Sequence, residues 1–159
     1  MGDDSIGRYI EDFGLYFENF GLPRTAGRIL AWLLICDPPH QTMDELVETL
    51  QISKSTISTS SRMLIESGFI NRISLPGQRR DVYRIDNDAW IKGFERKSAE
   101  METMHQFAKR GLALVAQAPP EQRQRVEEMI EAYTFMGREY PLLLERWKQQ
   151  RQKKDSSQA

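Results

Sequence analysis

Residues Ser53 to Asp86 read SKSTISTSSRMLIESGFINRISLPGQRRDVYRID, and this stretch decides the fold. It predicts a helix, a glycine that ends the helix, and two strands joined by a Pro-Gly turn with two arginines behind it. A helix beside a basic two-stranded ribbon has a composition that suits a DNA groove.

The helix begins after Ser53, a good N-cap because its hydroxyl can accept a hydrogen bond from an amide one turn on. Ile57 and Leu64 are seven residues apart and share one face, with Ser61 between them. The opposite side presents short hydroxyls and two cations: Lys54, Ser55, Thr56, Ser58, Thr59 and Arg62. Serine and threonine are mediocre helix formers that can reach base edges and phosphates, so we favour groove binding over a merely solvated polar face.

The ribbon starts after Gly68, which can adopt the left-handed conformation that ends a helix. We expect strands over Phe69–Leu75 and Val82–Ile85, joined by a turn at Pro76-Gly77. The tip of this hairpin then carries Gln78, Arg79 and Arg80. Two adjacent arginines at a tip are well placed for phosphates or for a narrow minor groove.

The formal net charge of −1 looks wrong for a DNA-binding protein, but the charge is unevenly distributed. Residues 1–50 hold three basic and nine acidic side chains, whereas residues 51–84 hold six basic and two acidic ones. Positive charge is therefore concentrated in the helix and hairpin, which is the footprint expected for nucleic acid.

Three more helices precede or adjoin this stretch. An aromatic stripe favours a first helix over about residues 5–20, and Gly21-Leu22-Pro23 ends it. We expect a second helix over residues 24–36 and a short one over residues 42–50, which opens with a T-x-x-E capping box. The short helix, a tight turn and the helix capped by Ser53 make a helix-turn-helix, and the hairpin makes it a winged helix.

Four segments within residues 21–85 are specific as a set. They are Gly21–Arg28 (GLPRTAGR), Leu33–Pro38 (LLICDP), Ser53–Ser58 (SKSTIS) and Pro76–Arg80 (PGQRR). The set resembles the MarR superfamily of bacterial transcription regulators, and specifically its GbsR-type branch. The resemblance implies a homodimeric winged-helix regulator whose terminal helices form the dimer interface.

The sequence departs from the family pattern in two places. Relatives usually have an Asp two residues before the wing arginine, whereas Gly77 and Gln78 precede Arg79 here, so either Arg79 or Arg80 could enter the minor groove. Ser61 stands where many relatives carry a larger apolar residue, which predicts looser packing under the recognition helix.

The C-terminal half predicts two long helices, over about residues 87–117 and from Pro120 onward. With the aromatic first helix, they hold more apolar face than one small winged helix can cover. A second copy could cover the rest, and the alternative is an intrachain three-helix packing.

We therefore expect a mostly α fold with a small β wing, a winged helix-turn-helix with N- and C-terminal dimerisation helices. The expected divisions are a dimerisation helix at residues 1–22, a winged helix at 23–86, a helical dimerisation region at 87–152 and a disordered tail at 153–159.

Nothing in the sequence favours an enzyme, because it has no phosphate-binding glycine loop, no nucleophile elbow and no cluster with metal-ligand spacing. No cofactor or metal is expected. His40 and His105 read as surface or interface histidines. Cys36 should be buried and inert, with oxidant sensing as the alternative. A single cysteine, no signal peptide and no bilayer-length apolar run predict a cytoplasmic protein without a membrane partner.

We predict a sequence-specific DNA-binding transcriptional regulator, with repression as the favoured sign, that binds a near-palindromic operator in double-stranded DNA as a homodimer. The alternative is a winged-helix protein–protein interaction module that does not bind DNA. The predicted DNA contacts are Ser53, Lys54, Ser55, Thr56, Ser58, Thr59, Arg62, Arg79 and Arg80.

Control by a small-molecule effector is a further expectation. In the family that the chain resembles, small molecules bind where the terminal helices meet the winged helix, and some GbsR-type members respond to choline-like cations. Aromatic faces attract such cations. The aromatic residues that could converge there are Tyr9, Phe13, Tyr16, Trp90, Phe94 and Tyr133.

Overall fold

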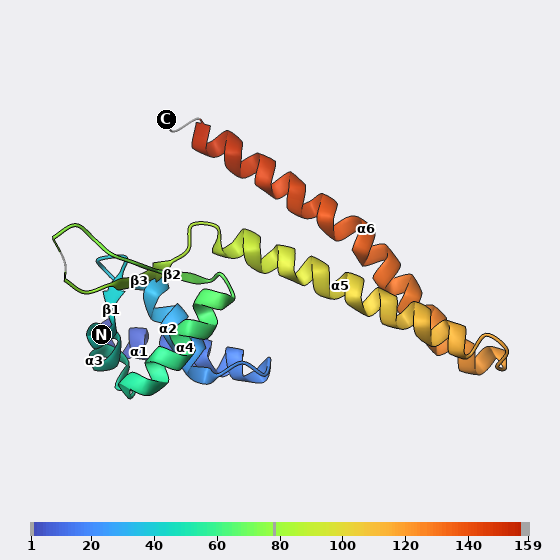
Figure 1. The fold of residues 1–159 in the computed structure, drawn as a ribbon, viewed down its shortest axis with the longest axis horizontal. Coiled ribbons are helices and arrows are strands. Elements are labelled where there is room, and N and C mark those ends of the chain that lie inside the picture. Colours follow the sequence, from blue (N-terminus) through green and yellow to red (C-terminus); the bar gives the residue numbers. More distant parts are fainter. Residues whose placement is uncertain (1, 78, 157–159) are drawn as a thin grey trace. The chain divides into compact units, whose positions relative to one another are not determined.

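The computed structural model describes residues 2–77 and 79–156, and it confirms a mostly helical fold with a small antiparallel sheet (Figure 1). Its elements are α1 (Gly2–Asn19), α2 (Arg24–Ile35), β1 (Gln41–Thr42), α3 (Met43–Leu50), α4 (Lys54–Glu66), β2 (Ile70–Ile73), β3 (Val82–Ile85), α5 (Ala89–Leu114) and α6 (Pro120–Ser156). The chain forms two compact units that divide after Trp90.

The first unit is built around α2, which packs against α1, α4 and β3. Ile29, Leu30 and Leu33 of α2 are buried in its core. The close approach of α1 to α2 depends on two glycines. A Cβ atom at Gly27 would lie only 2.9 Å from the Cα of Gly14 and 2.9 Å from the main-chain oxygen of Phe13. Gly27 is therefore required by the space between the two helices.

The helix-turn-helix forms where the capping residues predict it. The side chain of Thr42 accepts from the Glu45 amide, and the Glu45 carboxylate accepts from the Thr42 amide, which completes the capping box of α3. Gln51 ends α3 in the left-handed conformation, with φ of 53°. Ser53 then caps α4, since its hydroxyl accepts from the Thr56 amide at 3.3 Å. Local side-chain chemistry thus sets both ends of the turn.

The sheet has three strands in the order β1-β3-β2, all antiparallel. The β2–β3 hairpin is the predicted wing, although β2 is shorter than the expected Phe69–Leu75 strand. Gly68 and Gly77 both adopt positive φ, at 70° and 79°, as the helix end and the turn require. β1 was not predicted, and it joins the start of α3 to the wing by pairing Thr42 with Val82.

The second unit is a pair of long helices, α5 and α6, joined by a short connection (Figure 1). The amine of Lys148 binds the Glu95 carboxylate at 2.7 Å and so links the two helices. α6 continues to Ser156, so residues 153–156, expected to belong to a disordered tail, are helical, and residues 157–159 lie outside the described part of the chain. Among the helices described, none is long and apolar enough to cross a membrane.

Replacing Gly27 by Ala should lower the free energy of unfolding by about 1–3 kcal/mol, because the added methyl group would meet backbone atoms that cannot move aside cheaply. Urea unfolding followed by circular dichroism measures the change. Gly7→Ala is the matched control, since nothing lies within 4 Å of its Cβ position in α1, and it should stabilise the helix by about 0.5–1 kcal/mol. Equal stabilities for the two variants would contradict the packing described for α1 and α2.

Ser61 gives a second stability test, because its side chain is buried and its hydroxyl has no hydrogen-bond partner among the described residues. Ser61→Ala should raise the free energy of unfolding by about 0.5–1 kcal/mol, since it removes an unsatisfied polar group. Ser53→Ala on the same helix should lower it by about 1 kcal/mol through loss of the N-cap. Chemical denaturation of both variants would count against this reading if Ser61→Ala proved the more damaging change.

Candidate nucleic-acid interface

The two faces of α4 differ sharply in burial and composition. Its buried residues are Ile57, Ser60, Ser61 and Leu64. The predicted DNA contacts on this helix and its cap are exposed, except for the half-buried Ser58: Ser53, Lys54, Ser55, Thr56, Thr59 and Arg62. The structure therefore brings these seven predicted residues together on one accessible side of the helix. Short hydroxyls there allow a close approach to a groove floor.

Hydroxyl groups are already ordered at the start of α4. Ser53 Oγ lies 2.8 Å from Thr56 Oγ1 and 3.1 Å from Ser55 Oγ. Thr59 donates to the Ser55 carbonyl at 3.1 Å. A hydroxyl can donate one hydrogen bond and accept two, so these contacts leave capacity for an outside partner.

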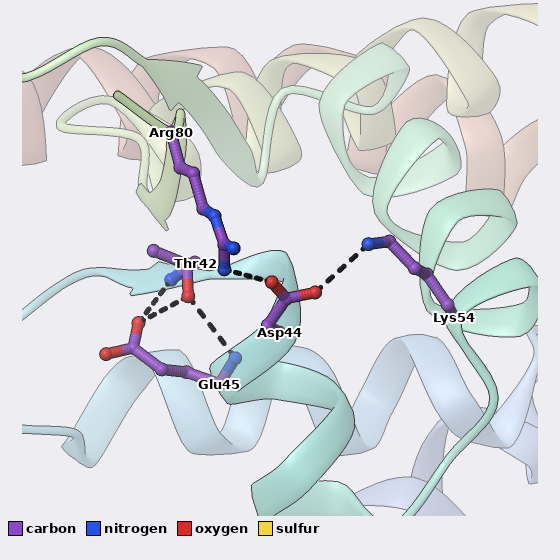
Figure 2. Close-up of polar contacts among 5 residues, drawn as sticks. All are labelled: Thr42, Asp44, Glu45, Lys54 and Arg80. Carbon is purple, nitrogen blue, oxygen red and sulfur yellow. Dashed lines mark hydrogen bonds and ion pairs between the residues drawn. The ribbon is translucent and has the colours of Figure 1, made fainter. Parts of the chain in front are cut away.

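One carboxylate joins three elements of the first unit (Figure 2). Asp44, in the first turn of α3, binds Lys54 Nζ of α4 through Oδ1 at 3.0 Å and Arg80 of the wing through Oδ2. The hydrogen bond from Lys54 and the charge of Arg80 lower the pKa of Asp44 below its ordinary value. Asp44 therefore stays ionised at neutral pH and bridges the predicted recognition helix and wing.

The remaining cations of the basic segment differ in how firmly they are held. Arg72 pairs with Asp81 at 3.2 Å within the hairpin, and Arg84 donates to Asn71 at 3.1 Å. Arg62 and Arg79 are exposed and make no hydrogen bond or ion pair with any residue that the structure describes. Gln78, predicted at the hairpin tip with Arg79 and Arg80, lies outside the described residues.

Sequence reasoning missed the role of Asp44. The residue was visible only as an unassigned position inside the T-x-x-E capping box. Its partners lie 10 and 36 positions away in the chain. The pairing of Thr42 with Val82 places the start of α3 beside the wing, and a two-residue strand carries too little pattern to be predicted. An acidic residue next to a cap was the sole sequence signal.

Five of the six predicted effector residues take part in ring contacts. Along α1, the Phe13 ring lies 5.8 Å from Tyr9 and 6.5 Å from Tyr16. Trp90 lies edge-on to Phe69 at 6.3 Å, within the same unit.

In the second unit, Phe94 meets Trp147 edge-on at 5.8 Å and lines a cavity of about 500 Å³. Tyr133 lines a different cavity of about 470 Å³ with Met101 and Met104. Trp147 was not among the predicted effector residues, since its partner on α5 is 53 positions away in the sequence.

The side chains of Cys36 and His105 are both largely covered by other residues. Cys36 is buried, and desolvation raises the pKa of its thiol, which disfavours the reactive thiolate. His105 is largely covered between α5 and α6, where its Nε2 lies 3.0 Å from the Thr134 hydroxyl. Of the two predicted alternatives, a surface or an interface histidine, His105 is therefore the second, at the interface of α5 and α6.

Comparisons with known proteins agree with this architecture. Residues 20–81 match a family model described as the MarR family, and residues 88–150 match one described as MmpR5-like MarR family transcriptional regulator. The GbsR-type branch suggested by the sequence motifs is narrower than these matches and stays a prediction.

Individual relatives extend the match over most of the chain. HTH-type transcriptional regulator MmpR5 of Mycobacterium tuberculosis is 38% identical over 134 residues, which are 84% of this chain and 81% of the relative. HTH-type transcriptional repressor OpcR of Bacillus subtilis is 30% identical over 79 residues, which are 50% of this chain and 42% of the relative. A crystal structure of a transcriptional regulator has a TM-score of 0.74 and 37% identity, and the match covers 91% of this chain and 99% of that one.

These matches span both the helix-turn-helix with its wing and the long C-terminal helices. The chain belongs to the MarR family of transcriptional regulators.

Proposed function

We propose that this regulator binds a near-palindromic DNA site as a homodimer, with α4 in the major groove and the wing against the neighbouring backbone or minor groove. The observation that carries the proposal is the division of α4. Ile57 and Leu64 are buried, while the side that faces outward carries hydroxyls and Arg62. A helix that buries one face and exposes short polar groups on the other fits a groove-reading role better than a protein–protein surface, which is enriched in aromatic and aliphatic anchors.

The roles of the predicted contacts follow from their chemistry and from the partners they already have. Lys54 and Arg80 would each contact a DNA phosphate, and in the structure both form ion pairs with Asp44. Thr56 and Arg62 are exposed on α4 and can read base edges. Arg79 makes no ion pair to the described residues, so we assign it, in preference to Arg80, to the minor groove.

Exposed apolar side chains support a second copy as partner. Tyr16 and Phe20 of α1 are 58% and 69% exposed, and Phe135 and Leu143 of α6 are 55% and 57% exposed. Apolar surface of this kind on terminal helices is typical of a protein–protein interface. Repression is the sign of regulation that we propose, in line with the relative named as a repressor.

We also place a small effector, mainly apolar or cationic, in the second unit. The cavity beside Phe94 and Trp147 has the size of a small-molecule site, and Tyr140 and Leu144 add to its lining. Arg151 already lies 5.9 Å from the centre of the Trp147 ring, so that ring face accepts a cation. A ligand that favours one arrangement of the helices would change DNA affinity by its difference in binding to the two states.

Replacing Arg79 and Arg80 together by Ala should weaken binding to every duplex sequence and reduce the steepness of the salt dependence. The log–log slope should fall by about one to two units, since each lost phosphate contact removes about 0.9. Fluorescence anisotropy on a labelled duplex over a range of salt concentrations gives the slope. The hairpin would not be a DNA-binding wing if the double variant bound as well as the parent.

The matched control is the double variant Arg125→Ala/Arg138→Ala, which removes the same charge from exposed positions of α6. It should leave the slope nearly unchanged, because neither arginine is among the proposed phosphate contacts. Thr56→Val should differ from both, since loss of a base-reading hydroxyl changes the preferred sequence and not the slope.

A further inference from the structure

Two cations proposed to bind DNA phosphates already form ion pairs in the free protein. Lys54 belongs to α4 and Arg80 to the wing, and both bind the carboxylate of Asp44 (Figure 2). Each cation has its own oxygen, Oδ1 for Lys54 and Oδ2 for Arg80. Two non-bridging oxygens of a DNA phosphate could be shared between two cations in the same way, so the carboxylate resembles the ligand that these cations are proposed to bind.

Asp44 is not needed to cap its own helix. The capping box of α3 is complete without it, since Thr42 and Glu45 satisfy one another's amides. The hydrogen bond from the Thr42 amide is the main cause that lowers the pKa of Glu45, so that carboxylate is committed to the cap. The Asp44 side chain, in contrast, points toward α4 and the wing (Figure 2).

The position of Asp44 is fixed by backbone structure. The pairing of Thr42 with Val82 joins β1 to the wing strand β3, and α3 begins at the next residue, Met43. The carboxylate is therefore held beside the wing whether or not the two ion pairs form. Because Asp44 remains ionised at neutral pH, its competition with an outside anion is permanent under those conditions.

We propose that Asp44 is an intramolecular competitor for DNA phosphate, which holds Lys54 and Arg80 in the free protein and must be displaced when DNA binds. The inference rests on the proposed DNA-binding function and adds a residue that limits affinity. A carboxylate that merely supported the fold would strengthen DNA binding by its presence, whereas a competitor weakens it. The two roles therefore predict opposite signs for the same substitution.

The test is the affinity of Asp44→Asn for a random-sequence duplex at about 0.1 M salt. We expect binding to tighten about two- to tenfold, the range for releasing two exposed ion pairs. Glu48→Gln is the matched control, because it removes one carboxylate from the same helix, and Glu48 is exposed and has no ion pair with a described residue. It should change affinity by less than about twofold.

A double-mutant cycle separates local competition from a general change of charge. In a Lys54→Ala/Arg80→Ala background, Asp44→Asn should lose its advantage over Glu48→Gln. Asp44→Ala, checked for native circular dichroism, guards against a new contact made by the asparagine amide.

The outcomes are distinct. The inference is supported if both Asp44 variants bind DNA more tightly than the parent, and if this gain disappears in the Lys54→Ala/Arg80→Ala background. Weaker binding, or an effect equal to that of Glu48→Gln, overturns it and leaves DNA binding intact. If the wild-type protein retains no duplex even at low salt, the proposed function is overturned, and this inference with it.

Discussion

The burial of one face of α4 is the constraint on which the rest of the first unit depends. Ile57 and Leu64 are almost completely buried, and the helix packs directly against α2. Burying these two side chains contributes about 1.5–3 kcal/mol each. Because a helix is rigid, fixing the apolar side also fixes the direction of the opposite side, and so exposes the hydroxyls and Arg62. The face proposed to bind DNA is a consequence of the packing.

Ion pairs then determine which basic side chains of the wing are held and which are accessible. Ion pairs hold Arg72 within the hairpin and Arg80 against Asp44, while Arg79 is left accessible beside them. Exposed ion pairs of this kind are weak, so they can be exchanged for contacts to an anion without disturbing the fold. The first unit thus combines a firmly packed helix with a wing whose polar contacts are easily exchanged.

The parts that could be predicted from the sequence are those governed by neighbours in the chain. The caps at Thr42 and Ser53, the positive φ at Gly68 and the two faces of α4 all depend on residues a few positions apart. The contact of Asp44 with Arg80 could not be predicted, because it depends on a two-residue strand that pairs across the fold.

Ring contacts were unpredictable for the same reason. Which aromatic residues are in contact depends on how helices pack, and Phe94 packs against Trp147 instead of the other predicted effector residues. The helical extension through residues 153–156 has a local cause, since lysine is a good helix former and Lys153 and Lys154 favour the last turn electrostatically.

The central claim is that α4 reads DNA from a two-fold symmetric dimer. Hydroxyl-radical footprinting on a fragment selected from a random DNA pool tests it most directly. We expect two equivalent protected half-sites about 10–10.5 base pairs apart, centre to centre, because each α4 would enter one of two successive major grooves. A single protected patch without two-fold symmetry would contradict this claim. So would a selection in which the protein retains no DNA fragment at all.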